Sequence, residues 1–117
     1  MWVNINYPGC FNKDHIHPNC NWTGVYYVNT PINSGNLHLE DPRAGNVIML
    51  PNQLPMNKIP QRLWREENYK PIAGRLIMFP GYVNHCVNIN ESKKKGVEGW
   101  RISISFNFIQ HHFVKKA

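Results

Sequence analysis

The chain has 117 residues, a formal net charge of +6 and 42% hydrophobic residues. This length suits one domain with one core, over residues 1–117, and leaves no room for two. Nine prolines and eight glycines indicate many turns and argue against long helices, so we expect an all-β fold.

The first half of the chain contains four short runs with strand character. The run over 22–29 (WTGVYYVN) is β-branched and aromatic, which is typical of strands. Residues 36–40 (NLHLE) alternate between apolar and polar, which is also typical of a strand. Two further apolar runs are predicted at 2–7 and 46–50.

Residues 51–71 carry four prolines and no clean hydrophobic period. We expect an irregular segment here, with at most a helical turn near 61–66. Long loops in compact domains are often functional lids, and Trp64 and Tyr69 would give such a lid side chains for packing.

The C-terminal half contains the clearest strand, over 100–108 (WRISISFNF), after shorter predicted strands at 75–79 and 84–88. Even positions from 102 to 108 are apolar and odd positions from 101 to 107 are polar, so the two sets lie on opposite faces. The apolar face needs a second sheet or a partner to cover it, and a homodimer is one such arrangement. Seven or so short strands predict a sandwich or jelly roll.

The positive charge is spread along the chain, and its one dense run is residues 93–95 (KKK). Such a run is typical of a solvated loop, and no basic stripe with aromatic residues indicates nucleic-acid binding. A basic protein would also attract anionic small molecules.

Three cysteines without a CxxC spacing favour a reducing compartment, although a bridge between Cys10 and Cys20 stays open. No stretch has the length and apolarity of a membrane helix, and residues 1–9 lack the features of a signal peptide. We therefore expect a cytoplasmic protein that makes no membrane contact.

Three histidines form a candidate metal site. His15 and His17 are two apart, which on an extended segment places both imidazoles on one face, within reach of one metal ion. His85 follows the Pro80-Gly81 turn and would bring a third ligand from a distant part of the chain. The alternative is that His85 is a buried, hydrogen-bonded core histidine.

Arg101 and Ser103 share the polar face of the last strand. A buried arginine is costly unless it pairs with an anion, and its planar fork suits a carboxylate. Ser103 could add a hydrogen bond from the same face. An exposed strand face with a solvated arginine explains the pattern equally well.

The order of these motifs resembles a known family. The quoted segments are HIHP (15–18), TGVYY (23–27), SGNLHLEDPR (34–43), FPGYVNH (79–85) and RISISFNF (101–108). Together they resemble the 2-oxoglutarate- and Fe(II)-dependent oxygenases, in particular a bacterial and phage branch, over residues 2–108. The resemblance implies a double-stranded β-helix, a cupin-like jelly roll, with iron at one open end.

The resemblance also implies site residues and cofactors. Fe(II) would be held by His15, His17 and His85, and the far carboxylate of the cosubstrate 2-oxoglutarate by Arg101 and Ser103. Tyr69 and Tyr27 are weaker candidates for the lining of the cosubstrate pocket. With O₂, such an enzyme hydroxylates a substrate, here a small molecule or an amino-acid side chain.

The chain departs from the wider family at the second metal ligand. Most of these oxygenases have a carboxylate there, whereas this sequence has His17. Either the site has three histidines, or a carboxylate arrives from elsewhere, with Asp41 the best candidate. Two alternatives remain: a cupin-type three-histidine metalloprotein that does not use 2-oxoglutarate, and a non-catalytic β-sandwich binding module.

Overall fold

The structure is a computed structural model that describes residues 1–43, 55–60 and 64–111. Its regular elements in these ranges are strands β1 Trp2–Asn6, β2 Asn12–His15, β3 Trp22–Asn29, β4 Leu37–Glu40, β5 Glu66–Tyr69, β6 Leu76–Pro80, β7 His85–Val87 and β8 Arg101–Phe108, with short 3-10 turns at Met56–Lys58 and Gly96–Gly99.

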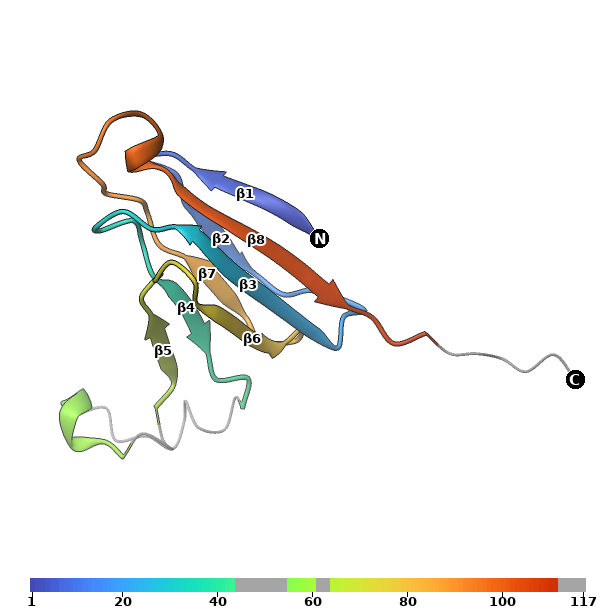
Figure 1. Cartoon of the computed structure of the whole chain (residues 1–117). Helices are drawn as coiled ribbons and strands as arrows, with labels where there is room; N and C mark the ends of the chain where they lie inside the picture. Colours follow the sequence, from blue (N-terminus) through green and yellow to red (C-terminus); the bar gives the residue numbers. More distant parts are fainter. Residues whose placement is uncertain (44–54, 61–63, 112–117) are drawn as a thin grey trace, which may run out of the picture.

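The strands form two antiparallel sheets that lie one behind the other (Figure 1). The first sheet has the order β1-β8-β3-β6, and the second has the order β2-β7-β4-β5. Except for β4 and β5, neighbouring strands are not consecutive in the chain, as a jelly-roll topology requires. The predicted all-β, double-stranded β-helix fold is therefore confirmed.

Strand β8 lies between β1 and β3 and is the centre of the first sheet. Its residues alternate between two environments, and the polar set faces the second sheet: Arg101 and Ser103 are buried. The same inward face includes Tyr27 of β3, which pairs with Ser103 in the register of the two strands. The interior between the sheets is thus partly polar, which is unusual for a core and indicates a binding cavity.

A small apolar cluster closes one side of this interior. Leu37, Phe79 and Val83 are buried together, and the side chains that pack against them are Val25, Leu39, Ile77 and Val87. These residues come from both sheets, so the cluster holds the sheets together beside the polar cavity.

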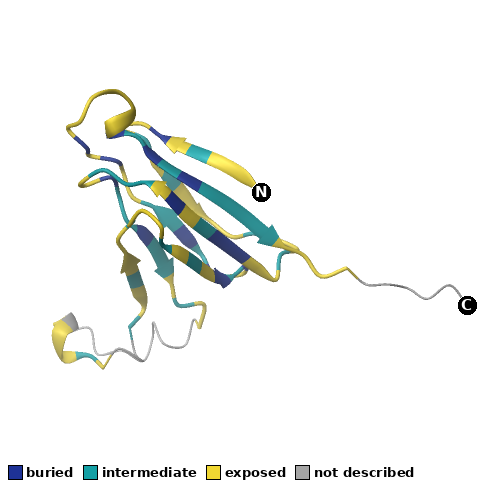
Figure 2. Cartoon of the chain, viewed as in Figure 1, coloured by how far each residue is buried: buried dark blue, intermediate teal, exposed yellow. Residues whose placement is uncertain are grey.

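The outer face of the first sheet is apolar and largely uncovered by the described residues. Its exposed side chains include Val3, Ile5, Trp22, Tyr26, Leu76 and Met78. Figure 2 shows buried and exposed residues alternating along β3 and β6. The apolar face of β8 was predicted to be covered by a second sheet or by a partner. The second sheet packs on the opposite, polar face, so a partner on the apolar face stays a prediction.

The segment over 51–71 is less irregular than predicted. Glu66–Tyr69 forms β5, which pairs with β4 from Leu37↔Tyr69 to Glu40↔Glu66. The expectation of irregular structure was wrong here because an edge strand with charged residues lacks the apolar alternation of a half-buried strand. Three predictions fall wholly or partly outside the described residues: the strand at 46–50, part of the turn at 61–66, and residues 51–54 and 61–63 of the lid.

The three cysteines Cys10, Cys20 and Cys86 are free thiols, so no Cys10–Cys20 bridge forms. In the part of the chain that the structure describes, no helix has the length and apolarity needed to cross a membrane.

Candidate metal centre

Three histidines meet at the end of the second sheet. His15 closes β2 and lies opposite His85, the first residue of β7, in the register of the two strands. His17 follows β2, and its backbone N–H donates to the Gly81 carbonyl at 2.8 Å, which ties this segment to the turn before β7. One potential ligand atom from each histidine lies within 4.8 Å of the other two.

The three rings pack closely. The Nε2 atoms of His17 and His85 are 3.2 Å apart, and their rings are stacked at an interplanar angle of 10°. The ring centroids of His15 and His85 are 4.2 Å apart. Among the described residues this is the one group of three or more such side chains with the geometry to hold a metal ion.

Backbone carbonyls orient two of the rings. Nδ1 of His15 is 2.6 Å from the Lys13 carbonyl oxygen, and Nδ1 of His85 is 2.9 Å from that of Val83. A carbonyl oxygen only accepts, so each Nδ1 must carry the hydrogen, which leaves a lone pair on Nε2. Metal-binding histidines are normally oriented by such a hydrogen bond from the ring nitrogen that does not bind the metal.

Burial favours the neutral form of two of these histidines, His17 and His85. His85 is 4% exposed, and burial lowers its pKa to about 4, although its hydrogen bond to Val83 acts in the opposite direction. Burial, and then the nearby His15, lower the pKa of His17 as well. Neutral imidazoles have the free lone pair that a metal ion requires.

The histidines line one cavity together with predicted cosubstrate residues. Its wall includes His15, His17 and His85 at one end and Tyr27, Arg101 and Ser103 from the first sheet, with the remaining lining from residues Trp2, Asn4, Asn6, Asn12, Thr23, Gly24, Val25, Leu37, Phe79, Val87 and Ser105. A larger open hollow lies beside Phe11–Asp14 and residues 86–91, but the histidine cluster is not part of it.

Arg101 is 1% exposed and is held by backbone carbonyls. Its Nη1 donates to the carbonyl oxygen of Ser34 at 2.5 Å and to that of Gly35 at 3.0 Å, with a longer contact to Asn88 at 3.4 Å. These contacts fix the guanidinium through Nη1 and leave Nη2 available for another acceptor.

Nη2 of Arg101 is buried and has no hydrogen-bond partner among the described residues. No carboxylate in the described ranges forms an ion pair with this arginine. Burial lowers the pKa of Arg101, and the neighbouring Tyr27 opposes that shift. A buried cation with an unused donor is costly, and a bound carboxylate would supply both the countercharge and the acceptor.

The absence of a side chain at Gly35 allows Arg101 to approach the backbone closely. Its φ angle is +90°, which disfavours any side chain, and a Cβ here would collide with the Asn88 carbonyl oxygen and lie 2.8 Å from Nη1 of Arg101. The SG pair in the quoted SGNLHLEDPR segment provides two of the three carbonyls that hold Arg101.

The other predicted residues divide into two groups. Ser103 and Tyr27 are buried in the cavity wall, and burial raises the pKa of the Tyr27 phenol. Tyr69 is 36% exposed on β5 and does not line this cavity. Asp41 forms an ion pair with Arg43, Oδ2 to Nη2 at 2.6 Å, and lies outside the histidine cluster.

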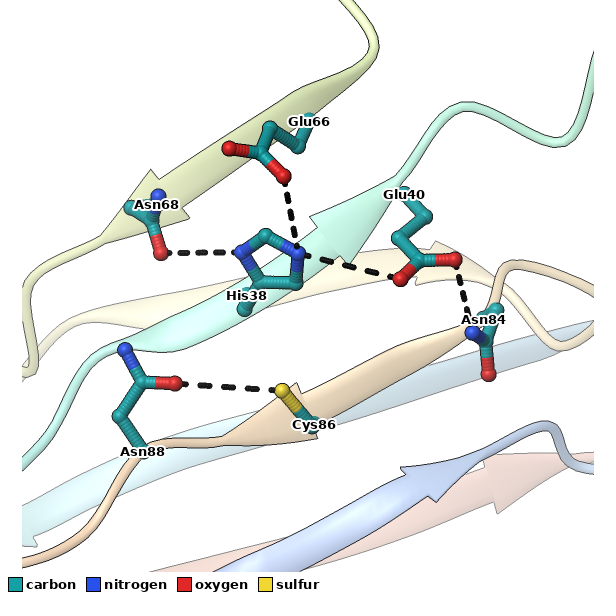
Figure 3. Close-up of polar contacts among 7 residues, drawn as sticks. All are labelled: His38, Glu40, Glu66, Asn68, Asn84, Cys86 and Asn88. Atoms are coloured by element: carbon teal, nitrogen blue, oxygen red, sulfur yellow. Dashed lines mark hydrogen bonds and ion pairs between the residues drawn. The ribbon is translucent and has the colours of Figure 1, made fainter. Parts of the chain in front are cut away.

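His38 points to the opposite side of the second sheet (Figure 3). Its Nδ1 is 3.1 Å from the Asn68 side-chain oxygen, and its Nε2 is 3.5 Å from Glu66 and 4.0 Å from Glu40. This outward-facing polar cluster is separate from the cavity, so His38 serves below as a control position.

Sequence reasoning missed two residues at the centre. Asn107, the last polar residue of the β8 alternation, has its Nδ2 3.2 Å from Nδ1 of His17. The ring centroids of Trp2 and His17 are 6.2 Å apart. The shared face of Asn107 and Arg101 was a usable signal, whereas nothing local marked Trp2.

Two facing antiparallel sheets, with a histidine cluster and a buried arginine in one cavity, define a jelly-roll protein with a candidate metal site. A family model described as "Putative 2OG-Fe(II) oxygenase" matches residues 1–107. The chain therefore belongs to the 2-oxoglutarate- and Fe(II)-dependent oxygenase family, and the predicted resemblance is confirmed.

Two solved structures share the fold. A prolyl-4-hydroxylase from Pseudomonas putida matches with a TM-score of 0.62 and 20% identity, over 94% of this chain and 51% of that one. An oxidoreductase of the 2OG-Fe(II) oxygenase family from Burkholderia pseudomallei matches with a TM-score of 0.62 and 14% identity, over 93% of this chain and 41% of that one. The chain thus spans about half the length of these proteins or less. No curated protein matches.

Proposed function

We propose that this protein is a 2-oxoglutarate- and Fe(II)-dependent oxygenase that hydroxylates a small molecule or an amino-acid side chain. One observation carries the proposal: the three histidines and the partnerless Nη2 of Arg101 line the same cavity. Membership of the family, whose cofactors are Fe(II) and 2-oxoglutarate, supports it.

The residues present fit both cofactors. Nε2 of His15, His17 and His85 would hold the iron, because one ligand atom from each lies within 4.8 Å of the others and burial favours neutral rings at His17 and His85. Nη2 of Arg101 and the hydroxyl of Ser103 would hold the far carboxylate of 2-oxoglutarate. When bound, Fe(II) and 2-oxoglutarate supply the chemistry: one oxygen atom of O₂ enters a substrate C–H bond and the other enters the succinate formed with CO₂.

The protein's own contribution is to position the reactants and exclude water. Arg101 is fixed on one edge by three carbonyls, so its free edge would present a preorganised site to the carboxylate. Tyr27, 2% exposed, adds an apolar wall with a polar tip beside it. Trp2 lies near His17 and is 41% exposed, which would offer apolar surface to a substrate at the entrance.

The remaining partner and location predictions belong to this proposal. We propose that residues 1–117 form one domain, which the match over residues 1–107 supports. A second copy of the chain is proposed to cover the apolar face of the first sheet, where Val3, Ile5 and Leu76 are exposed. We do not expect a nucleic-acid partner, and we expect a cytoplasmic location.

A second candidate is a three-histidine metalloprotein that does not use 2-oxoglutarate. The observation that favours it is the donor set: among the described residues no carboxylate joins the cluster, and Asp41 is paired with Arg43 instead. Three neutral ligands leave more positive charge on the metal ion than two histidines and one carboxylate would.

Calorimetric titration under anaerobic conditions separates the two candidates. Fe(II) is added to the protein first, and 2-oxoglutarate second, with Arg101→Gln measured in parallel. The oxygenase predicts cosubstrate binding to the iron-loaded wild type that Arg101→Gln loses, and succinate formation on admission of O₂. Iron binding with no affinity for 2-oxoglutarate in either protein would contradict the oxygenase and support the second candidate.

A further inference from the structure

Asn107 connects the first sheet to the metal centre. It lies on β8 opposite Thr23 of β3, on the same face as Arg101 and Ser103. Its Nδ2 is 3.2 Å from Nδ1 of His17, a residue 90 positions away that follows strand β2 of the second sheet. His17 therefore has a side-chain partner, whereas His15 and His85 are oriented by backbone carbonyls.

The second polar atom of the Asn107 amide has no partner. Its Oδ1 is buried and accepts no hydrogen bond from the described residues. Buried polar atoms are nearly always paired, so an unpaired oxygen on the same amide group that contacts His17 calls for an explanation.

The hydrogen positions around His17 supply one. Where the Asn107 N–H group donates to Nδ1, the hydrogen of neutral His17 must be on Nε2. That Nε2 is 3.2 Å from Nε2 of His85, which is free to accept because Nδ1 of His85 donates to Val83. The three contacts are mutually consistent, but this tautomer of His17 has no lone pair on Nε2.

A metal ion at the histidine cluster requires the other tautomer. Nε2 of His17 must then present its lone pair, so the hydrogen moves to Nδ1 and needs an acceptor. Half a turn of the Asn107 amide about its last side-chain bond brings Oδ1 to Nδ1. The oxygen that now has no partner is the acceptor that the metal-bound tautomer needs.

We propose that Asn107 is a positioning residue of the metal centre, whose amide donates to His17 in the free protein and accepts from it in the metal-bound protein. The inference rests on the proposed function, since it takes His17 as a metal ligand. It goes beyond that proposal by naming the side chain that sets the tautomer and orientation of the third ligand. The amide can serve both states because it has one donor group and one acceptor.

Zinc binding to protein labelled with ¹⁵N at histidine tests this directly, because Zn(II) is diamagnetic and accepts imidazole ligands. Long-range ¹H–¹⁵N spectra report the tautomer of His17, and calorimetry reports the affinity. In the wild type we expect Nε2–H in the free protein and Nδ1–H with zinc bound. Asn107→Leu, which has neither donor nor acceptor, should bind zinc about 10- to 100-fold more weakly.

Two further variants separate positioning from a general structural effect. Asn107→Asp has acceptor oxygens only, so it should hold His17 as Nδ1–H before zinc is added and restore at least wild-type affinity. Asn4→Leu is the matched control: Asn4 is an asparagine on the neighbouring strand β1 whose amide donates to Ser105 at 2.7 Å and not to a histidine, so its loss should leave zinc affinity within about twofold of the wild-type value.

The outcomes that overturn the inference differ from those that overturn the proposed function. Wild-type affinity in Asn107→Leu, no rescue by Asn107→Asp, or an unchanged His17 tautomer on zinc binding would each overturn the role of Asn107 alone. A wild-type protein that binds no zinc, or binds it equally well as His85→Gln, would overturn the metal centre and the inference with it.

Discussion

Nε2 of His17 lies 3.2 Å from Nε2 of His85, although the two residues are 68 positions apart in the chain. The contact is made because the segment after β2 is tied to the Gly81 turn, immediately before the strand that begins with His85. At this distance one neutral imidazole can donate a hydrogen bond to the other. A bound metal ion would instead accept a lone pair from each of the two nitrogen atoms.

Loss of His85 should remove metal-dependent stabilisation. A metal ion at 100 times its dissociation constant stabilises the wild type by about 2.7 kcal/mol, which corresponds to roughly 10 °C in Tm for a domain of this size. We expect His85→Gln to lose this shift in thermal denaturation with Mn(II), because one of three ligands is missing. His38→Gln, at the outward-facing cluster, should keep the full shift, and equal shifts in both variants would contradict the assignment.

Arg101→Gln should separate cosubstrate binding from metal binding. The substitution removes the partnerless Nη2 and the charge, so we expect the affinity of the metal-loaded protein for 2-oxoglutarate to fall about 100-fold. Mn(II) binding should change less than threefold, because Arg101 does not contact the histidine cluster. Both are measured by calorimetry, with Arg75→Gln as control, since Arg75 does not line the cavity. A parallel loss of both affinities would contradict the division of roles.

Gly35→Ala should destabilise the protein more than the same change at Gly74. Both glycines have positive φ, +90° and +84°, so both variants carry backbone strain of about 1 kcal/mol. At Gly35 the new Cβ also meets Asn88 and Arg101, whereas nothing lies within 4 Å at Gly74. We expect a further loss of about 1–3 kcal/mol at Gly35 in urea denaturation. Equal losses would show that the close approach to Arg101 is unimportant.

The metal-free protein should lose stability as the pH falls from 6.5 to about 4. The pKa of His85 is near 6.5 in the unfolded chain and about 4 in the folded one, so only the unfolded chain takes up this proton in that window.

Urea denaturation at pH 7 and pH 4.5 measures this loss. His85→Gln should show a smaller difference between the two pH values than the wild type, because glutamine takes up no proton. Identical pH dependence in the two proteins would show that His85 is not the group responsible. Carboxylates titrate in both proteins, so their contribution cancels in the comparison.

Strand positions were largely predictable from the sequence, whereas the inward face of β8 was not. The predicted strand at 22–29 coincides with β3, because β-branched and aromatic residues mark its whole length. Along β8 the alternation fixed two faces, but hydrophobicity alone would turn Ile102 and Ile104 inward. The structure buries Arg101 and Ser103 instead, because this interior is a cavity built around polar side chains.

The site was predictable only in part. His15 and His17 are close in sequence, and the Pro80-Gly81 turn marked His85, so spacing and turn chemistry could suggest that they meet. The shared face with Arg101 could have directed attention to Asn107, but no sequence feature reveals that its partner is His17. Strand β5 was missed because Glu66 and Glu67 give no apolar period, and its position depends on pairing with β4.

An anaerobic titration of the wild-type protein with Fe(II), followed by 2-oxoglutarate, tests the three-histidine centre directly when bound iron is measured by elemental analysis. We expect one iron per chain, cosubstrate binding only after iron is bound, and loss of iron in each of His15→Gln, His17→Gln and His85→Gln. Iron that remains stoichiometric when any of these three histidines is replaced would contradict the three-histidine centre.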